Sequence, residues 1–493
     1  MAKTVKQVAK ALKKKEKRDA FKKSFKDYFS FLGNAFTKGD WAVKSSLLVM
    51  GMGCFARKQI LKGILITLVE ICYILAMIVY VIPNLAKFGT LGTEKFSQTF
   101  DPLTMTTTVN DYDNSFLILL NSIIGIFLIF CFILYYIGNL RRAYALQVRA
   151  EQGKHINTFK EDLREMLGNR FHITMLTLPA MGVVLMNILP ILVLVAIAFT
   201  NYDQGHMPPN DLFTWVGWIN FKNLFVGQSM TITFSYAFWR ILIWTLVWSF
   251  LATFTCFIGG ILLAKLINGK GVKFPKMWRT LFIIAIAVPQ FVTLLLVRNF
   301  FGDQGIVNTI CSNIGLTDWL KHIGILGSSY SYIPFLTKPG WAHVMIILIN
   351  IWVGVPYQML IATGVLMNAP EDQMESARID GATNRQIFWK ITMPYVMVVQ
   401  GPALITDFVK NINNFNVIYL LTQDVYVTTN QQLANSNAKE VDLLVTWLFR
   451  LTNEYYNYKM ASVIGIIVFI ICVVFTLVSY SRVMAGGREE DYQ

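Results

Sequence analysis

The sequence predicts an all-α integral membrane protein with about eight transmembrane helices. Of its 493 residues, 55% are hydrophobic and only 15% are charged, whereas soluble domains carry roughly 45–50% apolar and about 25% charged residues. A hydrocarbon core roughly 30 Å thick is crossed by a helix of about 17–25 apolar residues, and eight segments reach this length. They are residues 61–85, 115–137, 173–199, 241–267, 281–297, 342–367, 394–421 and 460–480.

The loops between these segments differ in their content of lysine and arginine. The loop at residues 141–170 carries seven basic residues, whereas the longer loop at residues 201–239 carries only Lys222. Basic loops alternate in this way with poorly basic ones along the chain. Because Lys and Arg are enriched in cytoplasmic loops, we expect the basic loops and both termini to be cytoplasmic in a multi-pass protein of the cell membrane.

The first sixty residues carry much of the formal net charge of +15, including Lys13, Lys14, Lys22 and Lys23. A basic segment before a membrane span is explained more simply by an anionic membrane surface than by nucleic acid, so we expect no nucleic-acid partner. Some sixty polar or mixed residues precede the first span, unlike a signal peptide, and we expect them to be retained. Near-helical spacing predicts an interfacial amphipathic helix, formed by Phe21, Phe25, Tyr28, Phe29 and Leu32.

The loop at residues 368–394, between the sixth and seventh segments, has the composition of a helix–turn–helix. Pro370 suits a first helical position, and Glu371 suits the positive end of the helix dipole. Gly381 suits a chain reversal, after which Asn384 can cap a second short helix. We therefore expect a compact, rigid projection on the cytoplasmic face.

The loop contains Glu375-Ser376-Ala377, then Gly381 after three residues, Ile391 after nine more, and Met393-Pro394 after one more. This pattern resembles the "EAA" signature of the membrane subunits of ABC importers. The signature is Glu-Ala-Ala, three residues, Gly, nine residues, Ile, one residue, Leu-Pro, and here Ser and Met replace one Ala and the Leu. A generic amphipathic loop is the alternative, but the fixed offsets in a cytoplasmic loop favour the signature. The matching residues are Glu375, Ser376, Ala377, Gly381, Ile391, Met393 and Pro394.

The resemblance implies a six-helix type I ABC importer core, in which the first helix of this loop is a coupling helix. In that family the coupling helix docks in a cleft of the ATPase subunit and converts its closure into movement of the transmembrane helices. Glu375 would contact the ATPase, Ala377 would allow close packing, and Gly381 would permit the turn. The implied coupling residues are Glu375, Ser376, Ala377, Asp380, Gly381 and Pro394.

The sequence gives this chain no ATP-hydrolysing site of its own. The phosphate-binding pattern G-x-x-x-x-G-K-[ST] is absent, and the five histidines lack metal-ligand spacing, so we expect no catalytic residues, metal or cofactor. ATP and Mg would be used by a partner ATPase. The implied partners are a second permease subunit, a dimer of ABC ATPase subunits and an extracellular solute-binding protein, which we expect to be a lipoprotein.

The resemblance extends from about residue 173 to the C-terminus and is closest to the larger membrane subunit of maltose/maltodextrin importers. It rests on residues 199–203, 215–221, 350–357 and 411–415, and on Trp244 with Gly260 and Ala264. In that family the sugar lies midway through the membrane, on the two helices that flank the coupling loop. The positions that match the family's sugar contacts are Asn350, Gly354, Tyr357, Asn411 and Asn414.

These residue types suit a sugar. Hydroxyl groups and weakly apolar ring faces call for amide groups, an aromatic ring and a glycine where backbone approaches closely. Asn350, Gly354 and Tyr357 lie at i, i+4 and i+7, on one helical face. The alternative is that the asparagines only join helices to one another; taken together, the five residues favour a maltooligosaccharide site.

Two features depart from the family pattern. Lys410 stands where the family has an aromatic residue, and Asp407 lies three residues before it, so the two can form an ion pair along one helix. They can equally contact the substrate or the second permease, and Glu70 is similarly open. The external loop at residues 201–239 is much shorter than in some proteobacterial relatives, which suits a tethered binding lipoprotein.

We divide the chain into a basic segment (1–60), two accessory transmembrane helices (61–140), a cytoplasmic loop (141–172), the importer core (173–482) and a cytoplasmic tail (483–493). The nearest alternative is the same importer for another oligosaccharide or for glycerol-3-phosphate, an anion that Lys410 would favour. An ion-coupled transporter using Glu70 and Asp407 would predict inverted repeats and gives no reason for the coupling loop.

Overall fold

The computed structural model describes residues 15, 18–20, 30–103, 105–226, 234–269 and 271–486. Helices make up most of this part of the chain, in agreement with the predicted all-α class. The predicted interfacial helix falls mainly outside the described residues, since Phe21, Phe25, Tyr28 and Phe29 are not among them.

Within the described residues, six helices are long and apolar enough to cross a membrane. Each coincides with one of the eight predicted segments, so those six predictions are confirmed. Their bounds are Ile60–Ala86, Ser115–Glu151, Phe171–Ile197, Phe234–Ile267, Trp341–Met367 and Tyr458–Arg482.

The fifth predicted segment, residues 281–297, is interrupted. It is divided between α12 (Pro275–Ala287) and α13 (Gln290–Phe300). Val288 between them is extended (φ −75°, ψ 127°), the conformation that the ring of the following Pro289 favours for the residue before it. The count of apolar residues was correct, but the helix is broken.

The seventh predicted segment, residues 394–421, is interrupted as well. α19 (Met393–Ile412) ends before Asn413, and α20 (Phe415–Thr422) starts after Asn414. The Asn414 side chain accepts a hydrogen bond from the backbone N–H of Val417 (3.3 Å) and so caps the new helix.

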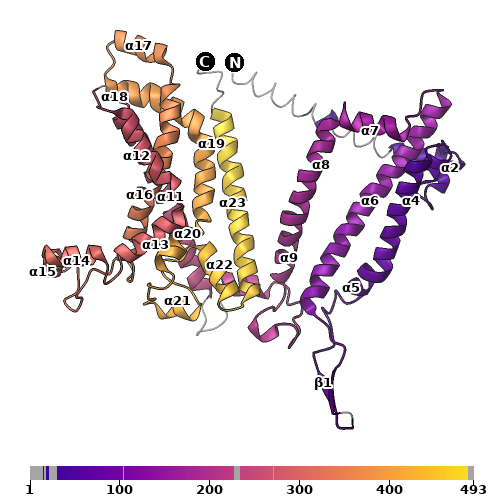
Figure 1. Cartoon of the computed structure of the whole chain (residues 1–493), viewed down its shortest axis with the longest axis horizontal. Coiled ribbons are helices and arrows are strands. Elements are labelled where there is room, and N and C mark those ends of the chain that lie inside the picture. Colours follow the sequence, from indigo (N-terminus) through magenta and orange to yellow (C-terminus); the bar gives the residue numbers. More distant parts are fainter. Residues whose placement is uncertain are drawn as a thin grey trace. The chain divides into compact units, whose positions relative to one another are not determined.

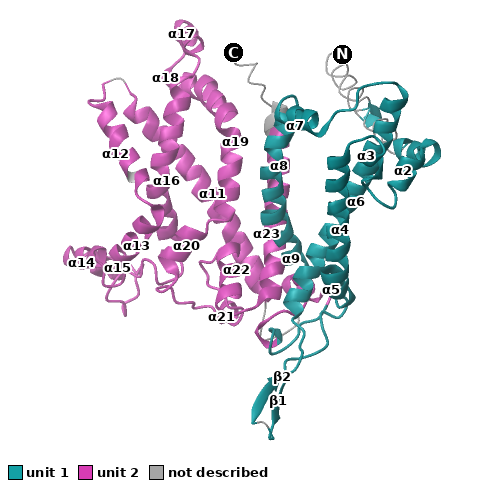
Figure 2. Cartoon of the chain, turned by 45° about the vertical axis from the view of Figure 1, so that its right-hand side comes forward, with its two compact units in different colours: residues 1–196, 206–215 teal, residues 197–205, 216–493 magenta. Residues whose placement is uncertain are grey.

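The chain forms two compact units, which Figure 2 distinguishes by colour. Unit 1 comprises residues 1–196 and 206–215, and unit 2 comprises residues 197–205 and 216–493. The elements of unit 1 are α2 (Trp41–Ser45), α3 (Met52–Phe55), α4 (Ile60–Ala76), η1 (Met77–Val81), α5 (Ile82–Ala86), β1 (Gln98–Asp101), β2 (Thr106–Val109), α6 (Ser115–Glu151), α7 (Phe159–Leu167), α8 (Phe171–Val183), η2 (Val184–Ile188) and α9, whose last residue belongs to unit 2 (Leu189–Ile197).

Unit 1 is built around α4 and α6, with the antiparallel hairpin β1–β2 between them in sequence (Figure 1). α2 and α3 contact α6, and Met50 and Cys54 are buried in a cluster with Ile66 of α4. The Glu70 carboxylate of α4 accepts a hydrogen bond from the backbone N–H of Met50 (2.9 Å). Glu70 therefore has a structural partner in the chain between α2 and α3.

Unit 2 contains the other helices. After η3 (Gln204–His206), where the chain passes between the units, they are α10 (Ile219–Phe225), α11 (Phe234–Ile267), α12, α13, α14 (Ile306–Asn313), α15 (Leu316–His322), α16 (Trp341–Met367), α17 (Glu371–Ile379), α18 (Asn384–Ile387), η4 (Phe388–Thr392), α19, α20, α21 (Gln431–Asn435), α22 (Leu444–Asn453) and α23 (Tyr458–Gly486).

Small residues let α11 and α16 approach closely in the centre of unit 2. A Cβ atom added to Gly260 of α11 would lie 2.5 Å from the Cβ of Gln358 on α16, and one added to Gly259 would lie 2.8 Å from a Val355 methyl group. Helices inside membranes gain stability from such close contact because lipid offers no hydrophobic driving force between them. α11 and α16 therefore form the structural centre of this unit.

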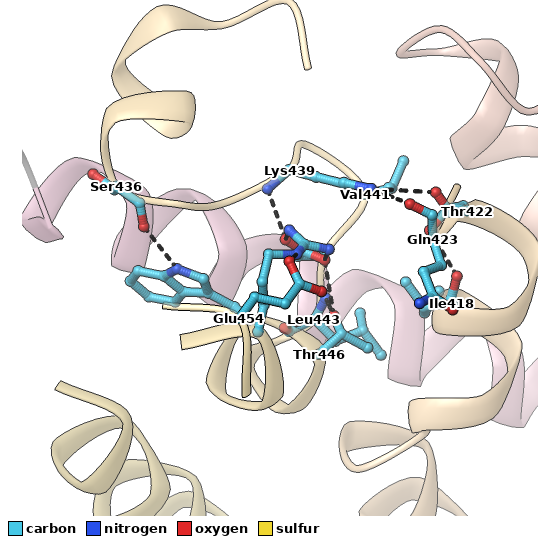
Figure 3. A network of polar contacts seen from close by, with 12 residues as sticks. Ile418, Thr422, Gln423, Ser436, Lys439, Val441, Leu443, Thr446 and Glu454 are labelled. Carbon is cyan, nitrogen blue, oxygen red and sulfur yellow. Dashed lines mark hydrogen bonds and ion pairs between the residues drawn. The ribbon is translucent and has the colours of Figure 1, made fainter. Parts of the chain in front are cut away.

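A buried polar network joins the segment before α22 to α22 itself. The Asp442 carboxylate lies 2.6 Å from the Arg450 guanidinium, and their side chains are only 1% and 7% exposed. Asp442 also accepts from the hydroxyl of Thr446 (3.1 Å) and the backbone N–H of Lys439 (2.7 Å) (Figure 3). Burial, and then the nearby Arg450 charge, lower the pKa of Lys439, whose ammonium donates to the Gln423 carbonyl (2.7 Å).

We expect Arg450→Met to lower the free energy of unfolding by about 3–5 kcal/mol, because Asp442 is then left buried without its counter-charge. The matched control is Lys321→Met, which removes a cation from an exposed pair with Asp318 and should cost no more than about 1 kcal/mol. Unfolding of the purified chain in detergent measures both. Equal losses in the two variants would contradict the assignment of Asp442–Arg450 as a stabilising buried pair.

Candidate substrate cavity and coupling loop

One cavity of about 1040 Å³ lies in unit 2, among α11, α16 and the two interrupted segments. Non-helical backbone at membrane depth is tolerated only where it is buried in protein or lines a cavity. Both breaks fulfil this condition, since Val288 and Pro289 of one, and Asn413 and Asn414 of the other, line the cavity.

The three residues predicted on one face of α16 all line the cavity. Tyr357 is 48% exposed, so its ring is accessible. Asn350 is buried, and its amide contacts the Cys256 sulfur of α11 (3.5 Å). Gly354 also packs against Cys256, because an added Cβ would lie 2.7 Å from that sulfur. The close approach at Gly354 is therefore made by a neighbouring helix, a structural reason that the sequence did not reveal.

The two predicted asparagines of α19 and α20 also line the cavity. The Asn411 amide donates to the hydroxyl of Thr253 on α11 (3.0 Å) and its carbonyl oxygen accepts from the Asn414 amide (3.2 Å). The indole N–H of Trp248 donates to the backbone carbonyl of Asn411 (3.1 Å). These contacts hold the break in place and leave amide groups at the cavity wall.

Asp407 and Lys410 line the same cavity, and the ion pair that the sequence left as one of two possibilities is not formed between them. Asp407 accepts a hydrogen bond from the Gln358 amide of α16 (2.8 Å), and the part of the chain that the structure describes gives Lys410 no ion-pair partner. Spacing of i, i+3 places the two on adjacent turns, but the carboxylate is turned toward α16. Lys410 is exposed at the cavity wall.

Sequence reasoning missed several residues of the cavity wall. Gln358 follows Gly354 by four residues, so the same helical spacing pointed to it. A glutamine directly after Pro289, at position 290, was a signal for a polar site at a broken helix. The remaining polar and aromatic lining residues gave no recognisable pattern, and they include Thr253, Trp278, Phe282, Thr293, Phe415 and Asn416.

The coupling loop forms the predicted helix–turn–helix. α17 has no buried residue, and Glu375 and Ser376 are exposed while Ala377 is half-buried. After Asp380, Gly381 reverses the chain at φ +80°, a conformation that favours glycine.

The cap of the second helix differs from the prediction. Thr383, one residue before the predicted Asn384, accepts from the backbone N–H of Gln386 (3.3 Å), while the Gln386 side chain accepts from the backbone N–H of Thr383 (2.8 Å). This reciprocal arrangement satisfies two backbone N–H donors at once. A cap by the Asn384 side chain alone would lack the second of these hydrogen bonds.

The coupling loop is attached to both helices that line the cavity. It follows α16 directly, and η4 continues into α19, with Pro394 in its first turn. Tyr395 of α19 donates its hydroxyl proton to the carbonyl of Asn368 (2.9 Å), and the Lys265 ammonium lies 4.1 Å from the centre of the Phe388 ring. Figure 1 shows α17 and α18 beyond the ends of α16 and α19.

The comparisons with known proteins show the family of this chain. Residues 256–484 match the family described as the binding-protein-dependent transport system inner membrane component. The chain is similar to a maltodextrin transport system permease protein of Bacillus subtilis, with 30% identity over 90% of this chain and 95% of the relative. It is also similar to a galactooligosaccharides transport system permease protein of the same organism, with 33% identity over 86% and 94%.

A solved structure shares the fold. It is a bacterial ABC transporter involved in the import of the acidic polysaccharide alginate, with 24% identity and a TM-score of 0.50, covering 66% of this chain and 99% of that chain.

The chain belongs to the family of binding-protein-dependent transport system inner membrane components. It is a multi-pass permease subunit of an ABC importer, and the suspected resemblance is confirmed.

We expect Gly354→Ala to destabilise the chain by about 1–3 kcal/mol through overpacking against Cys256. Cys256→Ala removes the sulfur and leaves its Cβ at an ordinary 3.6 Å, so the double variant should recover most of the loss. Gly364→Ala on the same helix meets nothing within 4 Å and is the control. Melting temperatures in detergent measure these effects, and an unchanged Gly354→Ala loss in the Cys256→Ala background would contradict the contact.

Proposed function

We propose that this permease translocates maltose or maltodextrins through the cavity in unit 2. One observation carries the proposal: all five residues that match the family's sugar contacts line a single cavity, on α16 and on α19 with the break that follows it. The named relatives transport maltodextrin and galactooligosaccharides, so the shared chemistry is that of a neutral oligosaccharide.

The cavity wall supplies the groups that a sugar needs. The Tyr357 ring offers an aromatic surface for an apolar sugar face, and its hydroxyl can both donate and accept. The Asp407 carboxylate has an oxygen beyond the one that Gln358 contacts, and the Lys410 ammonium offers three donors to sugar hydroxyls. About 1040 Å³ is ample for a short oligosaccharide, given that ligand cavities commonly measure about 300–1,000 Å³.

We place this chain in an assembly with a second permease subunit, an ATPase dimer and an extracellular solute-binding lipoprotein. Both termini, the coupling loop and the basic loops lie on the cytoplasmic side. ATP and Mg are used by the ATPase, and this chain performs no bond chemistry. Closure of the ATPase dimer pushes on α17, and the movement passes through α16 and α19 to the cavity, which then opens to alternate sides of the membrane.

We expect Glu375→Lys to abolish uptake of labelled maltotriose by cells that carry the assembled importer, because a cation replaces the carboxylate that contacts the ATPase. Gln373→Lys introduces a lysine on another face of α17, where Gln373 is also exposed, and should leave most of the uptake. Stimulation of ATP hydrolysis by the loaded binding protein should be lost in the first variant only. Full uptake by Glu375→Lys would exclude the coupling role.

We expect Tyr357→Ala to reduce maltotriose uptake about tenfold, the loss of roughly 1–1.5 kcal/mol of aromatic contact, while the complex still assembles with an active ATPase. Tyr357→Phe separates the contribution of the ring to uptake from that of the hydroxyl. Leu360→Ala is the control, because Leu360 lies on the same helix outside the cavity lining. Unchanged uptake by Tyr357→Ala would place the sugar elsewhere.

A second candidate substrate is an anionic solute, which Lys410 favours because the described residues leave its charge without an ion-pair partner at the cavity wall. Competition decides between the two. A neutral oligosaccharide should suppress maltotriose uptake and glycerol-3-phosphate should not. The reverse result would leave the assignment as an importer subunit unchanged and would make an anionic solute the proposed substrate.

A further inference from the structure

α7 carries an apolar stripe that stays exposed in unit 1. Its four large apolar side chains are 37–61% exposed, and α7 has no buried residue. They occupy positions i, i+4, i+7 and i+8, so they form one continuous stripe along the helix, with acidic residues on the opposite face. The stripe consists of Phe159, Leu163, Met166 and Leu167.

The helix is well defined and its junction with the next span is fixed. Thr158 caps α7 in a reciprocal arrangement with Glu161, and only three residues separate α7 from α8. At this corner Glu165 pairs with Arg170 (2.8 Å), and the Thr174 hydroxyl of α8 donates to the Met166 carbonyl (2.8 Å). Figure 1 shows α7 lying across the end of α8.

The start of a second membrane span contacts the beginning of α7. Lys62, in the first turn of the span Ile60–Ala86, forms an ion pair with Asp162 of α7 and donates to the carbonyl of Asn157 (3.1 Å). Gln59, just before that span, donates to the same carbonyl (2.6 Å). α7 is therefore attached to the first turns of two spans, where the chain enters the membrane.

We propose that α7 is an interfacial helix that lies in the plane of the membrane surface, with its apolar stripe covered by lipid. A short helix with one apolar face and one charged face, held at the level where spans begin, has the properties of a helix that inserts into the boundary between head groups and acyl chains. The connection between the accessory spans and the core would thereby be anchored to the bilayer. This inference does not depend on which solute is transported.

The test places the photoreactive residue p-benzoylphenylalanine at single positions of the full-length chain, which is purified with its importer partners and placed in nanodiscs of phosphatidylcholine. Leu163 lies on the apolar stripe, and Arg164 is the matched control on the polar side. Leu68, exposed on the α4 span, is the positive control for lipid contact. After irradiation, mass spectrometry of the labelled peptide identifies the adduct.

We expect a phosphatidylcholine adduct at position 163 with a yield at least about fivefold above that at position 164, as the one-sided insertion of an interfacial helix requires. A lipid adduct at position 68 with none at position 163 would overturn the proposal. So would a crosslink from position 163 to a protein in the co-purified importer, which would show that a partner subunit covers the stripe. Equal lipid labelling at positions 163 and 164 would also contradict the orientation.

Discussion

The fold depends on one constraint: inside a membrane, every backbone N–H and C=O must find a partner, because no water is present to supply one. Six of the predicted spans meet this constraint as continuous helices. The other two do not, and both of their breaks lie at the same cavity. The position of the site is therefore linked to the places where the helical pattern fails.

The two breaks have different causes and different support. At Pro289 the ring disfavours the helical conformation of Val288, although α8, α16 and α19 continue through Pro179, Pro356 and Pro402. At Asn413 and Asn414 the break is held by side chains, through the cap on Val417 and the contacts among Asn411, Thr253 and Trp248. The second break is tied to α11 and so positions α20 relative to the central α11–α16 pair.

Much of this architecture was predictable from the sequence because apolar length and turn chemistry are local properties. The six continuous spans followed from length alone, and Gly381 correctly predicted the reversal in the coupling loop. The breaks were missed because hydropathy counts apolar residues and does not register Pro289 or a capping asparagine. The ion pair between Asp407 and Lys410 stayed one of two possibilities, because spacing along one helix does not show that Asp407 contacts Gln358 on another helix. Gly354 lines the cavity, but its close neighbour, Cys256, lies 98 positions earlier in the sequence and was not predicted.

Two helices connect the loop at residues 368–394 to the cavity. α16 runs from the cavity to Met367, and α19 runs from Met393 to the cavity, and each contains an internal proline, Pro356 in α16 and Pro402 in α19. Tyr395 joins the beginning of α19 to Asn368, directly after α16, through a hydrogen bond. At the cavity end, only α19 gives way to a break. The helical path from the loop through α19 is therefore interrupted at Asn413 and Asn414, both of which line the cavity.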